Sequence, residues 1–455
     1  MKSIFLKYSL PALNQLLSQN EIHFSDIIDE LEKAILEYES KVHAWVHYDI
    51  DSLKKEVELK SKSLKELAKV SKLAGIPVGI KDIFNTKAFP TEMGSPTWKN
   101  FTPGNNARVV DLLIQQGALV AGKTVTAEFA VHELNETNNP HDISRTPGTS
   151  SSGSAVAVST GMVPYAMGTQ TAGSIVRPAS FCGIWGMKPS FGLLPRTGIL
   201  KTTDSLDTVG FLTSHGKNLR AILDSIRMRG PDYPFVYKNV DARGEVPKAK
   251  NSKWKIGFVK THVWDKAEKY AQDSFLEFIN KISKQENFEL TEIEWNEKVS
   301  LAHETHETIY NKSLSYYFQN EAKAGEHVSK IMRTMIDQGR DITPEQYKNA
   351  LHRQEQISKE VGNLLEPYDF VFSLGTSSDA PLRGVLEIPD PSLIWTLSHI
   401  PSIAIPVFRS PNGLPFGIQI ISKRWNDYLL LQAVEEMIDR EIIPSGSQEI
   451  INKDL

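Results

Sequence analysis

The feature that most constrains this chain is the segment 147–192, PGTSSSGSAVAVSTGMVPYAMGTQTAGSIVRPASFCGIWGMKPSFG, which is crowded with small and hydroxyl-bearing residues. It contains two serine sites, residues 150–152 and Ser174. Glycine, alanine and serine add little side-chain bulk, so backbone N–H groups can gather around a reacting atom. The segment therefore predicts a tightly packed backbone around two serine sites.

Length and charge favour a globular protein. The chain has 455 residues, of which 40% are apolar, and it can bury a large core. Its 51 Lys and Arg residues nearly balance its 55 Asp and Glu residues, the net charge is −4, and no long run of one charge sign is present. Because a polyanion-binding arm needs such a run, direct nucleic-acid binding is not expected.

Cysteine usage and hydropathy bear on the compartment. The single cysteine, Cys182, excludes an internal disulfide and a CxxC metal site and fits a reducing compartment; we interpret it as a small buried apolar residue. The N-terminal apolar run, 3–6, is too short for a secretory signal. The most apolar later stretch, 393–408, is shorter than a bilayer span of roughly 20 residues. A cytoplasmic protein without membrane contact is expected.

Alternating apolar and helical segments predict an α/β fold. Residues 1–72 form a largely helical arm, with Ile27, Leu31 and Ile35 at helical spacing. Beyond it, short apolar runs alternate with helices, which indicates a sheet covered by helices. We expect one compact unit in which the arm packs on a core of residues 73–445. The expected elements include helices at 107–116, 266–284 and 427–438, strands at 254–260 and 288–295, and mostly helical structure over 302–361.

Two groups of residues can supply amide-hydrolysing chemistry, which needs a nucleophile, a base, a proton donor for the leaving amine and donors for the oxyanion. Lys81 directly follows the apolar run IPVGI, and burial there would keep it neutral and basic. Taken alone, Lys81 is better explained as an ordinary strand-end lysine that points to water, and only the neighbouring motifs favour a catalytic role. The serines at 150–152 also fit a loop and helix N-cap, because 155–159 has the pattern of a small-residue helix.

The run 79–82, Gly-Ile-Lys-Asp, together with the segment 147–192, resembles the signature of the amidase signature family of serine hydrolases. This resemblance implies an amidase-signature fold, with a mixed central β-sheet covered by helices on both faces. It also implies Lys81 as base, Ser150 as a relay within a cis peptide, and Ser174 as the nucleophile that forms an acyl-enzyme. No metal and no organic cofactor are implied.

The same resemblance assigns supporting residues. The run Thr171, Ala172, Gly173 and Ser174 would form the oxyanion hole through its backbone N–H groups. Ser151 would combine helix capping with a hydrogen bond that supports the active site, whereas Ser152 would only cap the helix.

Three positions depart from the common family pattern, and the first is Thr149, which replaces a glycine or other small residue. The other two are more informative. Gln170 stands where an acidic residue is usual, and Val176 stands where an arginine is usual, with Arg177 one position further on. Losing only one of the two charges would leave the other unpaired near a buried site. Because both change together, we expect a neutral or rerouted support behind the oxyanion loop, with Gln170 and Arg177 as supporting residues. The partner of Arg177 does not follow from the sequence.

Other interpretations of these motifs are weaker. The run 148–154, GTSSSGS, nearly matches a phosphate-binding loop but lacks its lysine. His303 and His306 in LAHETHETIY suggest a metal hydrolase, yet their spacing is not that of HExxH and no third ligand is evident, so a polar helix surface explains them better. Trp395 fits the substrate pocket and the core equally.

The main functional alternative is a glutaminase (A-type) subunit of a tRNA-dependent amidotransferase complex, which shares the fold and the triad. Such subunits usually carry the acidic residue and the arginine that are absent at Gln170 and Val176, which favours a stand-alone amidase. A non-catalytic scaffold is disfavoured because Lys81, Ser150 and Ser174 are all present. The expected partner is a small-molecule amide, and the resemblance allows a homodimer. Which amide is the substrate does not follow from the sequence.

Overall fold

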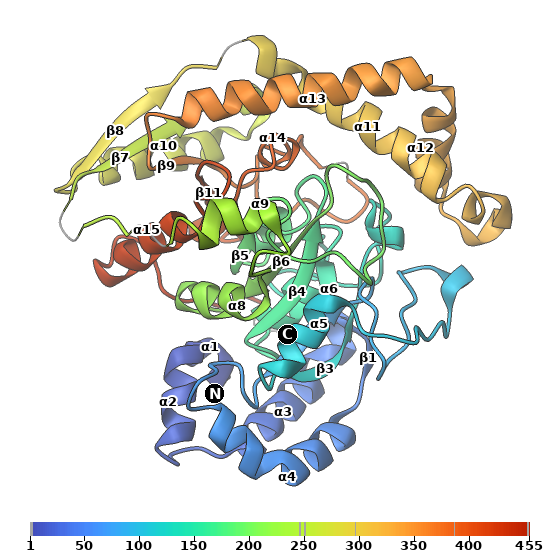
Figure 1. Cartoon of the computed structure of the whole chain (residues 1–455), viewed down its shortest axis with the longest axis vertical. Coiled ribbons are helices and arrows are strands. Elements are labelled where there is room, and N and C mark those ends of the chain that lie inside the picture. The colour runs from blue at the N-terminus through green and yellow to red at the C-terminus, as the bar shows by residue number, and fades with distance from the viewer. Residues whose placement is uncertain (1–2, 245–246, 250–251, 296, 386, 453–454) are drawn as a thin grey trace.

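A single mixed β-sheet organises the molecule (Figure 1). In the described residues it has 11 strands in the order β1-β3-β2-β4-β6-β5-β10-β11-β9-β7-β8. Strands β2, β3 and β4 run parallel, as do β7, β8 and β9, and the remaining pairings are antiparallel. The computed structural model describes residues 3–244, 247–249, 252–295, 297–385, 387–452 and 455. The strands are β1 (Trp45–Tyr48), β2 (Pro77–Lys81), β3 (Leu119–Thr124), β4 (Tyr165–Gln170), β5 (Trp185–Lys188), β6 (Thr208–Thr213), β7 (Trp254–Val259), β8 (Phe288–Ile293), β9 (Phe370–Leu374), β10 (Ser402–Arg409) and β11 (Pro415–Ile421).

Helices flank this sheet, and the expected fold class is confirmed. Periodicity located most of them well, because their apolar faces repeat at helical spacing. The expected helices at 107–116, 266–284 and 427–438 correspond to α5, α10 and α15. The α-helices are α1 (Ile4–Lys7), α2 (Leu10–Ser18), α3 (Phe24–Val42), α4 (Ile50–Leu67), α5 (Arg108–Gln115), α6 (Ser152–Ser159), α7 (Val176–Phe181), α8 (Leu219–Ile226), α9 (Pro234–Val236), α10 (Lys269–Ile282), α11 (Ala302–Tyr317), α12 (Lys330–Asp341), α13 (Pro344–Leu365), α14 (Leu393–Leu397) and α15 (Asp427–Asp439).

The N-terminal helices lie at one end of the molecule (Figure 1). Ile27, Leu31 and Ile35 form the buried face of α3, in agreement with their helical spacing. Between α3 and α4 the chain inserts β1, which pairs antiparallel with β3. The N-terminal segment is therefore joined to the central sheet by backbone hydrogen bonds as well as by helix packing.

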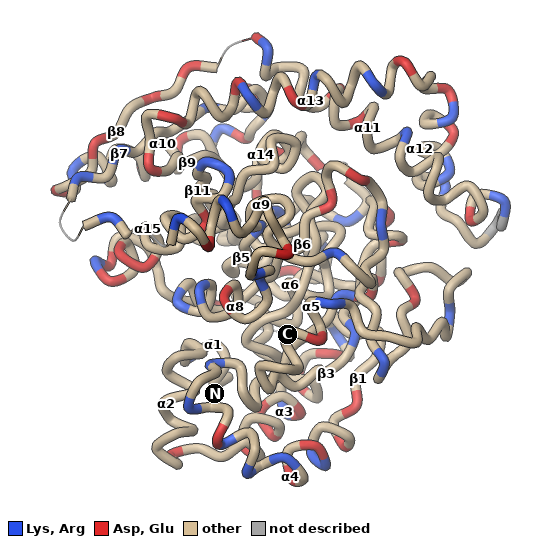
Figure 2. The backbone as a smooth tube through the Cα atoms, viewed as in Figure 1, with Lys and Arg blue, Asp and Glu red and all other residues tan. Residues whose placement is uncertain are grey.

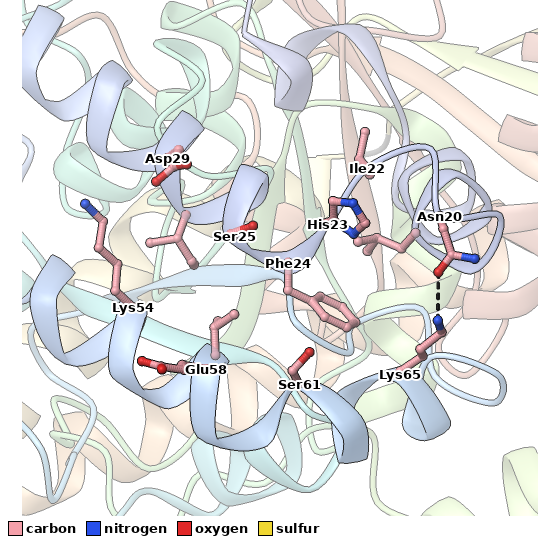
Figure 3. A pocket seen from close by; sticks show the side chains of 13 residues that line it. Asn20, Ile22, His23, Phe24, Ser25, Asp29, Lys54, Glu58, Ser61 and Lys65 are labelled. Atoms are coloured by element: carbon pink, nitrogen blue, oxygen red, sulfur yellow. Dashed lines mark hydrogen bonds between the residues drawn. The ribbon is translucent and has the colours of Figure 1, made fainter.

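Helices α2, α3 and α4 border a cavity of about 600 Å³ (Figure 3). Phe24 reaches into it from the start of α3, and the Lys65 ammonium donates to the Asn20 carboxamide oxygen at 2.7 Å across one end. Its lining comes from residues 17–65 alone. This cavity belongs to the N-terminal helices and is separate from the serine-rich segment.

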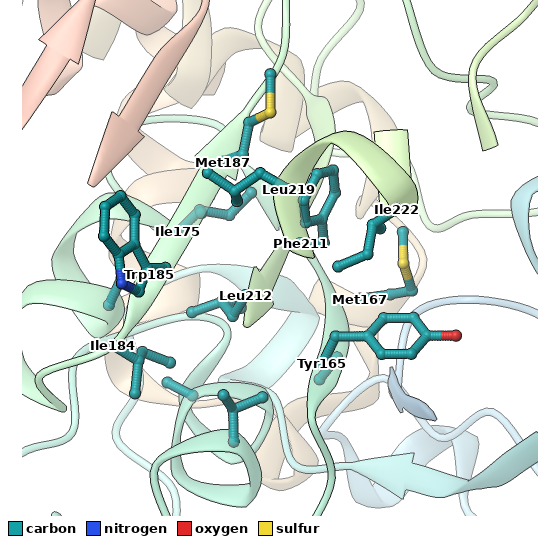
Figure 4. Close-up of a cluster of buried hydrophobic side chains, with 14 of the residues drawn as sticks. Tyr165, Met167, Ile175, Ile184, Trp185, Met187, Phe211, Leu212, Leu219 and Ile222 are labelled. Carbon is teal, nitrogen blue, oxygen red and sulfur yellow. The ribbon is translucent and has the colours of Figure 1, made fainter. Parts of the chain in front are cut away.

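The centre of the sheet is covered by apolar side chains (Figure 4). Met167 on β4, Met187 on β5 and Phe211 on β6 pack with residues of α8 such as Leu219 and Ile222, and all five side chains are fully buried. Close packing of this kind fixes the relative positions of neighbouring strands. It therefore also fixes the end of β4, from which the second serine loop begins.

Lys and Arg positions alternate with Asp and Glu positions along the outer helices (Figure 2). None of the described helices has the length and hydropathy that a bilayer crossing requires. Cys182 is fully buried, as expected, and burial raises the pKa of its thiol. Its thiol donates to the Pro147 carbonyl at 3.5 Å.

Candidate active site

Lys81 lies at the carboxyl end of β2, between the parallel strands β3 and β4. Its ammonium nitrogen lies 2.8 Å from the Ser150 hydroxyl, 3.1 Å from the Ser151 hydroxyl and 3.0 Å from the Thr169 hydroxyl. The side chain is fully buried. Burial lowers the pKa of Lys81 to about 7, against the opposing attraction of Asp207. Since hydroxyl groups carry no compensating charge, this site favours the neutral amine.

Ser150 lies two residues before α6 and follows a cis peptide bond, Thr149–Ser150. Its side chain is buried, with Lys81 as its hydrogen-bonding partner. The sequence alone offered loop and capping roles for the neighbouring serines. The structure brings Ser150 and Lys81 together because parallel strands end at one edge of a sheet and α6 begins above that edge.

The expected capping by Ser151 and Ser152 is wrong. Ser151 occupies the N-cap position of α6, yet its side chain makes no capping hydrogen bond. Its hydroxyl contacts Lys81 and the backbone of Thr169. Ser152 is the first residue of the helix, and its hydroxyl accepts from the Asn135 side chain at 2.8 Å. A buried amine that needs partners competes successfully with the helix end for the Ser151 hydroxyl.

The run 171–174 connects β4 to α7, and its carbonyl groups are held by three separate elements. The Thr171 carbonyl accepts from the His306 imidazole at 2.8 Å, and the Ala172 carbonyl accepts from the Thr396 hydroxyl at 2.7 Å. The Gly173 carbonyl accepts from the backbone N–H of Arg177 at 2.8 Å. Each of these carbonyls is thus fixed in direction.

Fixing these carbonyls also fixes the N–H groups that follow them, because a trans peptide points its N–H opposite to its C=O. Within the described part of the chain, no group accepts a hydrogen bond from the N–H of Ala172, Gly173 or Ser174. The Ser174 side chain is 6% exposed. Three unpaired donors therefore lie beside a serine hydroxyl at an almost buried position.

Gly173 is required by the packing of this run. A Cβ atom at position 173 would lie 1.5 Å from the Asp390 carboxylate and 2.8 Å from the Ser392 hydroxyl. Asp390 is itself held, since one of its oxygens accepts from the backbone and the hydroxyl of Ser392. No side chain larger than hydrogen fits here without displacing the run 171–174 or the segment before α14.

Gln170 holds the start of α7 and the Thr396 side chain by hydrogen bonds, next to the run 171–174. Its carboxamide oxygen accepts from the backbone N–H groups of Ile175 and Val176 at 2.9 and 3.0 Å. Its carboxamide nitrogen donates to the Thr396 hydroxyl at 2.9 Å. A carboxylate can accept both backbone bonds but cannot make the donation to Thr396. The neutral glutamine therefore links the start of α7 to the residue that holds the Ala172 carbonyl.

Arg177 has partners that the sequence did not reveal. Its guanidinium donates to the Thr149 carbonyl, at 2.9 Å from Nη2 and 3.3 Å from Nε. It also lies 3.0 Å from Glu387 and 3.2 Å from Asp390. Arg177 is thus a buried bridge between the peptide that precedes Ser150 and the acidic segment before α14. These carboxylates lie far along the chain, where no local motif indicates them.

A buried ion pair stands next to this site and was also missed. Asp82 and Lys123 are fully buried, and their charged atoms are 2.9 Å apart. The Lys123 ammonium also donates to the carbonyls of Phe84 and Pro90 and to the Thr91 hydroxyl. Burial raises the pKa of Asp82 and lowers that of Lys123, while their mutual attraction opposes both changes. The pair fixes the chain that leaves β2 directly after Lys81.

A cavity of about 570 Å³ adjoins the run 171–174. Its wall includes Ala172, Thr149 and Arg177, together with side chains of α11 and α12 and the segment 384–393. The cavity therefore reaches from the surface to the peptides that flank both serine sites. Its position makes it the candidate substrate pocket.

Two histidines of α11, His303 and His306, line this cavity. Among the described residues no group of three metal-ligating side chains is present. His306 holds the Thr171 carbonyl, and burial lowers the pKa of its imidazole to about 4. His303 lies 2.7 Å from His262. Trp395 belongs to the core, since it is 1% exposed and stacks on Trp295 with a ring separation of 5.6 Å.

Comparisons with known proteins identify the chain as an enzyme of the amide-hydrolase class. The family model described as Amidase matches residues 26–431. The chain therefore belongs to the Amidase family.

Individual relatives extend over nearly the whole chain. The A-type subunit of the glutamyl-tRNA(Gln) amidotransferase of Geobacillus sp. (strain WCH70) is 28% identical over 496 aligned residues, which cover 95% of this chain and 97% of that protein. A crystal structure of an amidase is 23% identical, with a TM-score of 0.83, and the match covers 95% of this chain and 100% of that chain. A peptide amidase, PAM, in complex with the competitive inhibitor chymostatin has a TM-score of 0.79 at 21% identity, covering 97% and 99%. These structures share the fold of this chain.

Proposed function

We propose that this protein is an amidase that hydrolyses a carboxylic amide to an acid and ammonia or an amine through an acyl-enzyme on Ser174. Lys81 acts as the base, and Ser150 relays the proton. The observation that carries this proposal is the 2.8 Å contact between the fully buried Lys81 amine and the Ser150 hydroxyl, beside the run 171–174. No metal or organic cofactor takes part in the proposed steps.

The first step is removal of the Ser174 proton. A serine hydroxyl is a weak nucleophile at neutral pH unless a base takes its proton. With a pKa of about 7, a substantial fraction of Lys81 is neutral at that pH. Lys81 takes the proton of Ser150, Ser150 takes that of Ser174, and the Ser174 oxygen attacks the carbonyl carbon of the amide.

The second requirement is stabilisation of the oxyanion. The unpaired N–H groups of residues 172–174 are the proposed donors. The hydrogen-bonded carbonyls of residues 171–173 belong to the same peptides and keep these donors in place. A donor of this kind is typically worth about 3 kcal/mol in the transition state. The protonated relay then delivers a proton to the leaving nitrogen, and water, activated by the same chain, hydrolyses the acyl-enzyme.

A glutaminase subunit of a tRNA-dependent amidotransferase complex is the second candidate. The relative from Geobacillus carries that name and aligns with 95% of this chain. The two candidates differ in what they need from partners. A stand-alone amidase turns over an amide as a purified single chain, whereas a glutaminase subunit would release ammonia from glutamine only in the presence of its partner subunits.

The decisive experiment is labelling with a fluorophosphonate probe, followed by mapping of the adduct by mass spectrometry. We expect the adduct on Ser174, with labelling strongly reduced in Lys81→Ala and Ser150→Ala. Ser159→Ala is a matched control, because Ser159 is a buried serine of the same segment whose hydroxyl donates to the Cys182 carbonyl. An adduct on another residue, or labelling that neither variant reduces, would contradict the proposal.

A further inference from the structure

The wall of the candidate substrate pocket has more acidic than basic side chains among the described residues. Arg177 is the one lysine or arginine among the described residues of its wall, whereas Glu307, Glu387 and Asp390 are acidic. Arg177 is already paired with Glu387 and Asp390 and donates to the Thr149 carbonyl. A guanidinium whose donors are committed in this way has little left to offer a further anion. The cavity therefore presents more unpaired negative charge than positive charge.

Helix α11 adds a second observation of the same kind. His303, Glu307 and Asn311 recur at every fourth position and line one side of the cavity. Asn311 is 3% exposed, its carboxamide nitrogen donates to Gln338, and its carboxamide oxygen has no donor among the described residues. A buried acceptor without a donor carries a cost that a ligand can remove. The carboxylate of Glu307, the exposed middle residue of this stripe, likewise has no partner within the described chain.

Another part of the wall is formed by apolar side chains. The apolar side chains come from α12 (Ile331, Met335), from the segment before α14 (Val385, Ile388) and from the first residue of α14 (Leu393). An apolar wall of this kind binds hydrocarbon by removing it from water. The cavity thus combines a hydrocarbon-binding side with a row of hydrogen-bond acceptors.

Resting on the proposed amidase function, we infer that the preferred substrate is a primary amide whose acyl group has a hydrocarbon chain that ends in a protonated amine. An ammonium group offers three donors and no acceptor, which matches Asn311 and the acidic side chains. A carboxylate at the same place would face acceptors and like charge. Since the leaving group of a primary amide is ammonia, the acyl group is the part that occupies the cavity.

Three amides of equal carbon-chain length test this inference: 5-aminopentanamide, pentanamide and glutaramate, which end in an ammonium, a methyl and a carboxylate group. Protection of Ser174 against fluorophosphonate labelling measures binding, and ammonia release measures kcat/KM. We expect 5-aminopentanamide to exceed pentanamide by about tenfold in both measurements and glutaramate to fall below pentanamide by a similar factor. Equal values for the three amides, or a preference for glutaramate, would overturn the inference.

Two variants locate the preference. Glu307→Gln and Asn311→Leu are expected to lower the ratio of 5-aminopentanamide to pentanamide by about threefold to tenfold each. Glu304→Gln is the matched control, because it removes the same charge from an exposed position of α11 that pairs with Arg353 and does not line the cavity. A ratio unchanged in both test variants would contradict the assignment. If the probe does not label Ser174 in the unmodified protein, the proposed function itself is refuted. If Ser174 is labelled but the three amides do not differ, only this inference is refuted.

Discussion

The carboxamide nitrogen of Gln170 donates to the hydroxyl of Thr396 at 2.9 Å, and that hydroxyl donates to the carbonyl of Ala172. Both side chains are fully buried. Gln170, which stands where the family pattern usually has an acidic residue, is thereby linked to the proposed oxyanion loop. The link uses its carboxamide N–H donor, which a carboxylate lacks. The neutral residue at this position has a definite structural use.

Replacing this donor should impair catalysis more than folding. In Gln170→Glu, the backbone bonds from residues 175 and 176 can persist, but Thr396 loses its donor and the Ala172 carbonyl becomes less firmly held. We expect kcat to fall by about tenfold to a hundredfold with a smaller change in KM. Steady-state kinetics with a primary amide measures this effect. Thr396→Ser, which keeps the hydroxyl, is the control, and an equal loss in both variants would argue against the hydrogen-bond chain.

The proposed role of Lys81 as base predicts that kcat/KM rises with pH. Because burial lowers the pKa of Lys81 to about 7, the active neutral amine is lost as the pH falls through that value. The rate constant kcat/KM should therefore rise with pH along a limb centred near 7 and level off above it. A pH–rate profile of the unmodified enzyme tests this. A limb centred above pH 9 would mean that Lys81 is protonated in the free enzyme and would contradict its role as base.

Gly173→Ala should abolish most of the activity. The added Cβ would have to displace the Asp390 carboxylate, which lies 1.5 Å from its position, and the proposed oxyanion loop, residues 171–174, would move with it. A loss of at least about a hundredfold in kcat is expected, since a misplaced donor no longer stabilises the transition state. Gly362→Ala in α13 is the control, because a Cβ there meets nothing within 4 Å. Activity of Gly173→Ala near that of the control would refute the close contact.

The buried pair of Asp82 and Lys123 should matter for stability. Removing one partner leaves a buried charge uncompensated, so Asp82→Asn and Lys123→Met should each lower the free energy of unfolding by about 3–5 kcal/mol. Denaturant unfolding monitored by tryptophan fluorescence measures this loss. The double variant should be less unstable than the sum of the single variants, because it leaves no unpaired charge. Strict additivity would show that the two side chains do not interact.

Local sequence patterns predicted those structural features that depend on residues close together in the chain. The helical face of α3 and the position of α5 follow from the spacing of apolar residues, and the resemblance of 79–82 and 147–192 to a family signature singled out Lys81 and Ser150, which the fold brings into contact. The confirmed α/β class follows from the same alternation of segments. These features need no knowledge of where distant parts of the chain lie.

Long-range contacts were not predictable in this way. The partners of Arg177, Glu387 and Asp390, and the pairing of Gln170 with Thr396, join segments that are far apart in sequence and meet only after the sheet has formed. Strand β1 was hidden for the same reason, because its four residues in a helical context acquire a partner only when β3 lies beside them. The prediction that the Ser151 side chain caps α6 was wrong because its hydroxyl instead contacts the buried amine of Lys81, which lies on β2.

The three groups that pin the proposed oxyanion loop come from α7, α11 and α14, so they leave the ribosome at different times. A nascent chain that has emerged only as far as α13 already contains Lys81, Ser150 and Ser174, yet it lacks Thr396 and the Asp390 carboxylate that contacts Gly173. The reactive hydroxyl would exist in that intermediate without a fixed set of donors. Under the proposed mechanism, competence for hydrolysis therefore depends on a segment, with Asp390 and Thr396, that is synthesised after all three proposed catalytic residues.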